Sequence, residues 1–364
     1  MKGQLKYFTD LGYKCYLIAP DDERTRNYCQ EEGAILLPVA IHREISIFND
    51  LKSLWVIIKH FYRIQPDIVN VGTPKMGLLG SLAGKMTGVK TRIYTCRGYR
   101  FEHEKGAMRK VLIAMEKLTS WAAHRVICIS LSVQELGVQH AIFSREKSKV
   151  INKGSSNGIE LDQFSANQVP KAATASLREA LGINDTDFVY GFVGRLIDRK
   201  GIKELYDAFE RLSLVLPNIK LVVVGPVEKS QISDLTILEK LEEHSNILMV
   251  GKQADVPLYL SLMDVFVLPA WWEGFGNVLV QAAAMGVPVI STTGTGSRDA
   301  VNDNYNGILV PPKDTQALVE AMKHLYQNES LREQLGENGV AWSKHFKNTT
   351  IWEGMRELYE EQNV

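Results

Sequence analysis

Short apolar runs alternate with amphipathic stretches along the whole chain. In the first half the runs are rich in β-branched and aromatic residues, which predicts buried strands. They lie at residues 14–20, 34–40, 66–72, 91–98 and 125–130. Between them, apolar residues recur every three or four positions, as at 48–63 and 106–123, which predicts helices. Alternating strands and helices indicate a parallel sheet covered by helices on both faces.

The second half repeats this pattern after a polar interruption. The stretch 154–176, "GSSNGIELDQFSANQVPKAATAS", is rich in Gly, Ser and Asn and predicts a linker. Strands are then predicted at 188–196, 219–225, 246–251, 264–269, 287–291 and 307–312. The pattern therefore predicts an α/β protein of two doubly wound, Rossmann-like domains that face one another across a cleft.

Composition narrows the function classes. The 364 residues are enough for two domains, and Lys+Arg and Asp+Glu are both 42, so no overall basicity points to a nucleic-acid partner. No apolar run approaches the length of a membrane span, and the chain opens with no secretory signal pattern. The four cysteines form no CxxC pair, which favours reduced, buried thiols in a cytoplasmic protein over a zinc site.

The stretch 268–291, "LPAWWEGFGNVLVQAAAMGVPVIS", places a glycine loop between a predicted strand and a helix that begins near Asn277. Loops at the carboxyl ends of parallel strands hold ligands, and the free N–H groups of a helix start favour a phosphate. Glu273 in this loop can accept hydrogen bonds from sugar hydroxyls, and Gln281 lies eight residues further on. The alternatives for this pair are a capping carboxylate and a surface glutamine.

A second strand-to-helix loop carries two cations. In "FVGRLIDRKGIKEL", 192–205, Arg195 and Lys200 flank a loop that leads into a helix near Gly201. Two cations beside a helix start suit a diphosphate, whereas the alternative is two solvated surface charges. The presence of two such loops favours the diphosphate.

Together these stretches resemble the family-4 glycosyltransferases of the GT-B fold. The resemblance rests on "VGRLIDRKG", "WWEGFGNVLVQAAAMGVPVIST", "NYNGILVPPKD" and "NKGSSNGIELDQF", and it covers nearly the whole chain. The stretch "GTPKMGLLGSLAGKMTGVKTRIYTCRGYRF" is similar to the bacterial capsule and exopolysaccharide transferases of that family. The resemblance implies retaining transfer of a sugar from a UDP- or GDP-sugar to a saccharide or lipid-linked saccharide acceptor. It implies no metal ion and no separate cofactor.

The resemblance also assigns roles residue by residue. It implies that a basic pair stabilises the leaving diphosphate and that the first carboxylate of an E-x7-E motif contacts the donor sugar. Gln281 stands where the second carboxylate of that motif binds the ribose. The expected catalytic residues are Arg195, Lys200 and Glu273, and the expected donor-binding residues are Gly194, Gly225, Gly274, Phe275, Gly276, Asn277 and Gln281.

The sequence departs from the family pattern at three places. The amide of Gln281 replaces a carboxylate. Arg97 stands where the family commonly has a histidine, with His103 displaced nearby, and this arginine can face a phosphate or pair with Glu102 or Glu104. The start, "MKGQLKYFTDLGYKCYLIAP", resembles the first helix and second strand of the fold. The usual first strand and its glycine-rich loop are therefore expected to be missing.

The expected domains are an acceptor-side domain at 1–165, a nucleotide-sugar domain at 166–345 and a helix at 346–364 that crosses back to the first domain. Helix 48–63 mixes apolar and basic residues; a half-buried helix explains it, and a membrane-surface contact is the alternative. A nucleotide-sugar epimerase of the same fold is the alternative enzyme. A donor-binding remnant with little transfer activity is the further alternative, because of the expected missing strand.

Overall fold

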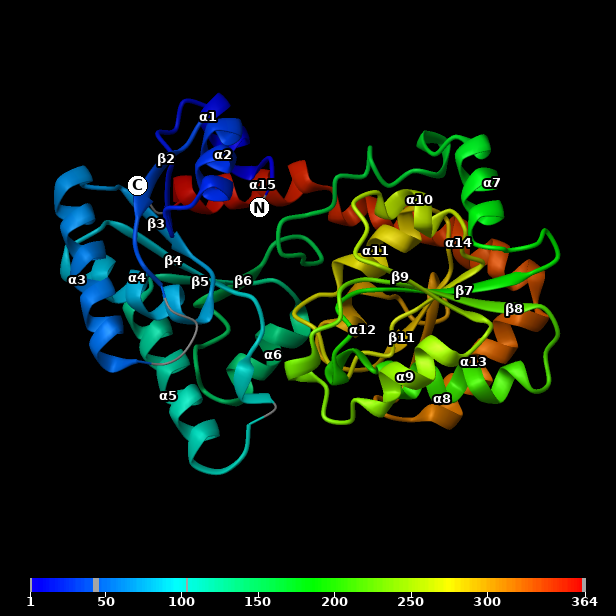
Figure 1. Cartoon of the computed structure of the whole chain (residues 1–364). Helices are drawn as coiled ribbons and strands as arrows, with labels where there is room; N and C mark the ends of the chain where they lie inside the picture. The colour runs from blue at the N-terminus through cyan, green and yellow to red at the C-terminus, as the bar shows by residue number, and fades with distance from the viewer. Residues whose placement is uncertain (1, 42–45, 103, 362–364) are drawn as a thin grey trace. The chain divides into compact units, whose positions relative to one another are not determined.

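The chain forms two compact units in a computed structural model, which describes residues 2–41, 46–102 and 104–361 (Figure 1). One unit comprises Met1–Gly158 and Asn348–Val364, and the other comprises Ile159–Lys347. The division thus falls at Gly158, not at residue 165. The physical reason is that Ile159 forms a parallel bridge with Lys347 and donates its N–H to the Phe346 carbonyl at 2.7 Å.

Every predicted strand is present, and all strand pairs are parallel. The strands are β1 (Tyr16–Ala19), β2 (Ile35–Pro38), β3 (Ile68–Val71), β4 (Thr91–Cys96), β5 (Arg125–Cys128), β6 (Ser148–Val150), β7 (Phe188–Val193), β8 (Ile219–Val224), β9 (Ile247–Gly251), β10 (Val265–Val267), β11 (Val289–Thr292) and β12 (Gly307–Val310). The sequence pattern missed β6, since three residues with a lysine at the centre show no apolar run.

The predicted helices at 48–63 and 106–123 are also confirmed, as α3 and α5. The α-helices are α1 (Gln4–Asp10), α2 (Glu23–Glu32), α3 (Ile47–Ile64), α4 (Pro74–Met86), α5 (Gly106–Ala122), α6 (Leu131–Gln139), α7 (Lys171–Ala180), α8 (Ile202–Ser213), α9 (Thr236–Glu243), α10 (Val256–Leu260), α11 (Asn277–Ala284), α12 (Ser297–Ala300), α13 (Thr315–Gln327), α14 (Glu329–Ser343) and α15 (Asn348–Glu361). Short 3-10 turns are η1 (Arg100–Glu102), η2 (Ala166–Gln168), η3 (Asp198–Lys200), η4 (Lys229–Gln231) and η5 (Lys344–Phe346). The end of the predicted linker is helical, because "KAATAS" is rich in alanine, the strongest helix former.

The second unit is built on one six-stranded sheet in the order β12-β11-β10-β7-β8-β9. Helices α8, α9 and α13 lie on one side of this sheet, and α7, α10 and α11 lie on the other (Figure 1). The chain runs from β7 towards β9 in one direction and from β10 towards β12 in the opposite direction. The order therefore reverses between β7 and β10, and such a reversal opens a crevice at the carboxyl ends of the two strands.

The strands of the first unit form two sheets, a four-stranded sheet β3-β4-β5-β6 and a two-stranded sheet β1-β2. Apolar residues of β4 and β5 alternate between two faces. Ile93 and Ile127 pack against α1 and α15, while Tyr94 and Val126 pack on the opposite side with α5. Helix α15 is therefore part of the core of the first unit.

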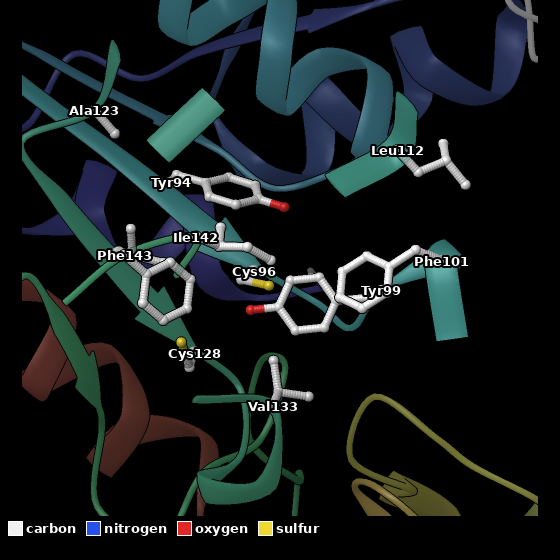
Figure 2. Packing of buried hydrophobic residues seen from close by; sticks show 11 residues of the cluster. Tyr94, Cys96, Tyr99, Phe101, Leu112, Ala123, Cys128, Val133, Ile142 and Phe143 are labelled. Atoms are coloured by element: carbon white, nitrogen blue, oxygen red, sulfur yellow. The ribbon is translucent and has the colours of Figure 1, made fainter. Parts of the chain in front are cut away.

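Figure 2 shows the second of these cores, in which Cys96 and Cys128 lie among Tyr99, Phe101 and Phe143. Burial raises the pKa of the Cys96 thiol to about 12, so this thiol stays protonated and unreactive at neutral pH. The chain's four cysteines are all free thiols, and Cys15 alone among them is half-buried and not fully buried. The expected burial is thus found for Cys29, Cys96 and Cys128, and Cys15 departs from it.

Candidate functional site

The loop after β7 turns sharply into α8. Gly201 precedes the helix with φ 71°, a left-handed conformation that favours glycine. A Cβ on Gly201 would lie 2.1 Å from the Pro269 carbonyl oxygen, so only glycine lets this loop approach the end of β10. The Trp271 N–H donates to the Arg199 carbonyl at 2.8 Å and fixes the approach. The loops on the two sides of the sheet reversal are thereby held together.

The loop after β10 presents unpaired backbone donors. Gly276 precedes α11 in the left-handed conformation, with φ 79°, and the helix begins at Asn277 as predicted. Within the described ranges, no protein group accepts a hydrogen bond from the N–H of Gly274, Phe275 or Gly276. Free N–H groups at a helix start attract an anion, because their partial charges add to the helix dipole.

Glu273 is buried beneath this loop and is held from two sides. The Glu273 N–H donates to the Thr295 carbonyl at 2.8 Å. A Cβ on Gly296 would lie 2.4 Å from the carbonyl oxygen of Glu273, so Gly296 also packs closely against it. Its carboxylate forms an ion pair with the Lys200 ammonium, in which the side chains are 12% (Lys200) and 11% (Glu273) exposed.

Arg195 lies on the same loop as Lys200 but pairs elsewhere. Its guanidinium forms an ion pair with Glu228 at 2.9 Å, and its side chain is 40% exposed. Arg199, between the two predicted cations, is partly buried, and burial lowers its pKa below the usual value, an effect that the nearby Glu273 carboxylate opposes. Arg199 therefore adds a third cation to this loop. Arg199 was not among the residues expected at the site from the sequence.

Two of the predicted glycines, Gly194 and Gly225, approach each other closely. Gly225 ends β8 with φ 145°, and a Cβ there would lie 1.8 Å from the Gly194 carbonyl oxygen. A Cβ on Gly194 would in turn lie 3.9 Å from the Lys200 side chain. The structure thus brings Gly194, Gly225, Lys200, Glu273 and Gly276 into one chain of contacts.

The remaining predicted residues divide by what their side chains do. The Phe275 ring is buried and packs on Phe346 at 5.1 Å between centroids, so only its backbone is available to a ligand. The Gln281 amide makes no hydrogen bond within the described part of the chain and is half-buried on α11. No sequence motif pointed to Thr295 and Gly296, which support Glu273 from a loop more than twenty residues away.

In the first unit, Arg97 follows β4. Its guanidinium donates to the Ser156 hydroxyl and, at 3.3 Å, to the Ser156 carbonyl. Burial lowers the Arg97 pKa, and a Cβ on Gly72 would lie 2.9 Å from its Nε. Arg97 therefore joins the loops that follow β3, β4 and β6. His103, the other residue singled out here, lies outside the described residues.

Protein-family models and known proteins both match this chain as a glycosyltransferase. The model of Glycosyltransferase Family 4 matches residues 3–162, and that of Glycosyl transferases group 1 matches residues 174–342. The Staphylococcus aureus capsular polysaccharide biosynthesis glycosyltransferase CapM is 35% identical over 99% of this chain and 93% of its own length.

Two further proteins are more distant. The Escherichia coli UDP-Gal:alpha-D-GlcNAc-diphosphoundecaprenol alpha-1,3-galactosyltransferase is 26% identical over 86% of this chain and 80% of its own length. The crystal structure of Anabaena Alr3699/HepE in complex with UDP and glucose has a TM-score of 0.83 at 20% identity, covering 98% of this chain and 94% of that one. The chain belongs to glycosyltransferase family 4 and is a retaining glycosyltransferase of the GT-B fold.

Proposed function

We propose that the chain transfers a hexosyl group from a UDP-hexose to a saccharide carried on a lipid diphosphate, in the assembly of a surface polysaccharide. The S. aureus relative acts in capsular polysaccharide biosynthesis, and the E. coli relative uses UDP-Gal and a diphosphoundecaprenol-linked sugar. The Anabaena neighbour was crystallised with UDP and glucose. These names support the choice of donor and acceptor class.

The observation that carries the proposal is the Lys200–Glu273 pair beside the free N–H groups of Gly274–Gly276. A cation and several backbone donors suit the two phosphates of the donor. A carboxylate at the same place suits the hydroxyls of the sugar, because an ionised carboxylate only accepts hydrogen bonds. The pair therefore suits both groups joined by the bond that breaks, the donor sugar and the diphosphate.

In the proposed reaction the bond between the sugar C1 and the diphosphate oxygen breaks, and the acceptor hydroxyl oxygen forms a new bond to C1 on the same face. The departing phosphate oxygen takes the acceptor's proton. Negative charge grows on the nucleoside diphosphate, and Lys200, Arg195 and the loop N–H groups stabilise it. These donors are fixed before the reaction, so little reorganisation is needed.

Arg195 and Gln281 have secondary roles in this proposal. The ion pair with Glu228 holds Arg195 at the surface of the loop after β7, where its partly exposed guanidinium can also contact a phosphate. The Gln281 amide, which lacks a protein partner among the described residues, is proposed to bind a ribose hydroxyl. The close approach of Gly225 and Gly194 leaves space for the nucleotide, because neither residue carries a side chain.

The test uses purified protein with a panel of UDP- and GDP-sugars. A donor that binds should raise the melting temperature by mass action. The stabilising donor is then incubated with a diphosphoundecaprenol-linked saccharide, and the anomeric configuration of the product is determined by NMR. Release of UDP with retained configuration supports the proposal, and an isomerised nucleotide sugar formed without acceptor would instead indicate an epimerase.

A further inference from the structure

The segment that leads to Glu273 carries a half-buried tryptophan, Trp271, whose side chain reaches α8. Its indole Nε1–H donates a hydrogen bond to Glu204 Oε1 at 3.0 Å. Glu204 lies in the first turn of α8 and is only 9% exposed. The second oxygen of this carboxylate, Oε2, is buried and accepts no hydrogen bond from the described residues. Within that part of the chain, the Trp271 indole is therefore the one hydrogen-bond donor to Glu204.

A carboxylate at this place needs an explanation. The start of a helix favours an acid, because the free N–H groups there carry partial positive charge. That effect acts on an exposed acid too, whereas Glu204 is buried together with Leu205 and Ala208 of the same helix. Burying a carboxylate with a single hydrogen bond costs free energy that burying a leucine would not. The helix start thus explains why an acid is tolerated, but not why it is turned inwards to Trp271.

The backbone and the ring of Trp271 are held by three further contacts. The N–H donates to the Arg199 carbonyl, in the loop after β7, at 2.8 Å. A Cβ on Gly294, after β11, would lie 2.4 Å from the Trp271 carbonyl oxygen, so only glycine lets that loop approach. The Lys313 Nζ, after β12, lies 3.8 Å from the centroid of the indole ring. Trp271 thus fixes the loop after β10 to the loops after β7, β11 and β12.

Two side-chain contacts join the same pair of segments. The Lys200–Glu273 ion pair and the Glu204–Trp271 hydrogen bond both run between residues 200–204 and residues 271–273. In the proposed reaction the donor diphosphate engages the Lys200 ammonium, and the donor sugar engages the Glu273 carboxylate. The ion pair therefore weakens when the donor binds, whereas the hydrogen bond uses neither of these groups and remains.

We infer that Trp271 is a positioning residue for the donor sugar. Its hydrogen bond to Glu204 keeps Glu273 at the place from which the carboxylate binds the sugar, while Lys200 is engaged by the diphosphate. The inference rests on the proposed function, because it takes Glu273 as the residue that contacts the donor sugar. Free UDP lacks the sugar that is transferred, so Trp271 should matter for the binding of UDP-glucose and not for that of UDP.

Calorimetry with UDP and UDP-glucose tests this difference. Trp271→Phe keeps an aromatic ring and removes the indole N–H, and Glu204→Leu removes the acceptor. Each should weaken UDP-glucose binding about tenfold, the lower end of what a hydrogen bond to a charged group is worth, and change UDP binding by less than about twofold. Glu204→Gln should stay near the parent for both ligands, because the amide oxygen can still accept from the indole. Equal losses for the two ligands, or no loss for UDP-glucose, would overturn the inference.

Two comparisons separate positioning from general damage. A Glu273→Ala background has no carboxylate to position, so adding Trp271→Phe there should weaken UDP-glucose binding by less than about twofold. A further loss as large as in the parent would show that Trp271 does not act through Glu273. The matched control is Trp352→Phe in the first unit, which removes an indole hydrogen bond to Asn157 Oδ1 of 3.1 Å. The control should leave the ratio of the two dissociation constants unchanged, and a change as large as that of Trp271→Phe would contradict the positioning role.

Two measurements without any nucleotide keep the test independent of the donor. The chain has six tryptophans, so its NMR spectrum should show six indole N–H signals, and Trp271→Phe identifies the one that disappears. That signal should shift in Glu204→Leu much more than in Glu204→Gln. Hydrogen exchange of residues 271–276 should be faster in Trp271→Phe and Glu204→Leu than in the parent, while that of β8 stays the same. If the parent binds neither UDP nor UDP-glucose, the proposed donor is wrong, whereas unchanged exchange at residues 271–276 would overturn the positioning role itself.

Discussion

Replacing Lys200 by Met tests the central contact of the proposed donor site. The substitution keeps most of the aliphatic stem and removes the ammonium that faces Glu273 and the proposed diphosphate. A hydrogen bond to a charged group is worth about 1.5–3 kcal/mol, so the variant should bind UDP about 10- to 100-fold more weakly. Uridine, which has no phosphate, should bind as it does to the parent.

The two ligands separate a binding role from a structural one. Calorimetry measures both dissociation constants well below the melting temperature, so that both proteins are folded. If uridine and UDP lose affinity equally, Lys200 acts by holding the loops in place, and the assignment of the diphosphate is wrong. If neither loses affinity, the diphosphate binds elsewhere.

The stability of the variant can be worked from the burial of the pair. Both side chains are about one-tenth exposed, and removing one partner of a buried ion pair costs about 3–5 kcal/mol. Because some solvent reaches the pair, we expect about 3 kcal/mol for Lys200→Met. Adding Glu273→Gln removes the uncompensated carboxylate and should recover most of this loss. Urea unfolding of the single and double variants should give a coupling energy of about 2 kcal/mol; additive losses would show that the two charges do not interact.

Turnover and a matched control complete the test. With saturating donor, Lys200→Met should lower kcat about 100-fold or more, the scale of losing one preorganised electrostatic donor. Lys203→Met is the control, because Lys203 is an exposed lysine on α8 whose ion pair with Asp207 lies at the surface. The control should change stability by less than about 1 kcal/mol and leave turnover unchanged. A control that loses as much turnover would mean that the assay reports general damage.

Three further changes have outcomes set by single features. Gln281→Glu should tighten UDP binding several-fold, since a charge-assisted hydrogen bond to the ribose is stronger by about 1 kcal/mol, and equal or weaker binding by calorimetry would remove Gln281 from the ribose site. Gly225→Ala should abolish UDP binding and lower the melting temperature, because the new Cβ would lie 1.8 Å from the Gly194 carbonyl oxygen. Gly251→Ala is the control: Gly251 has a positive φ but open space around it, so the free energy of unfolding should fall by only about 1 kcal/mol. Burial raises the Glu116 pKa from 4.5 to about 7, so the folded state holds this proton and the parent should lose stability as pH rises from about 4.5 through about 7. Glu116→Gln should remove that dependence and be more stable by about 2 kcal/mol at pH 8, and parallel urea midpoints of the two proteins at pH 5 and pH 8 would contradict the assignment.

The local elements could be read from the sequence because their causes are local. Runs such as 219–225 and 188–196 are short and mostly apolar at consecutive positions, as expected for strands that are buried on both faces. The glycines at 201 and 276 end one element and begin the next, so the strand-to-helix loops could be placed to within a residue. The strand β6 could not, because its pairing with β5 and not its composition makes it a strand.

The partners within the site could not be read in the same way. Lys200 and Arg195 look alike in "GRLIDRKG", yet one is buried against Glu273 and the other lies at the surface against Glu228. Phe275 looked like part of the donor loop, and its ring turned out to be core. In each case the deciding neighbour comes from a distant part of the chain.

The sequence by itself determined the alternation of strands and helices, the two site loops and the family, since periodicity, glycine positions and motif spacing act over a few residues. The tertiary structure alone decided which charges meet. The reversal of strand order between β7 and β10 brings two loops about seventy residues apart into contact, and Thr295 and Gly296 fix Glu273 between them. The packing of α3, α4 and α5 likewise decided which of their apolar residues face the sheet and which face outwards. A helix shows only its own periodicity in the sequence, and the surface that covers it is supplied by the rest of the fold.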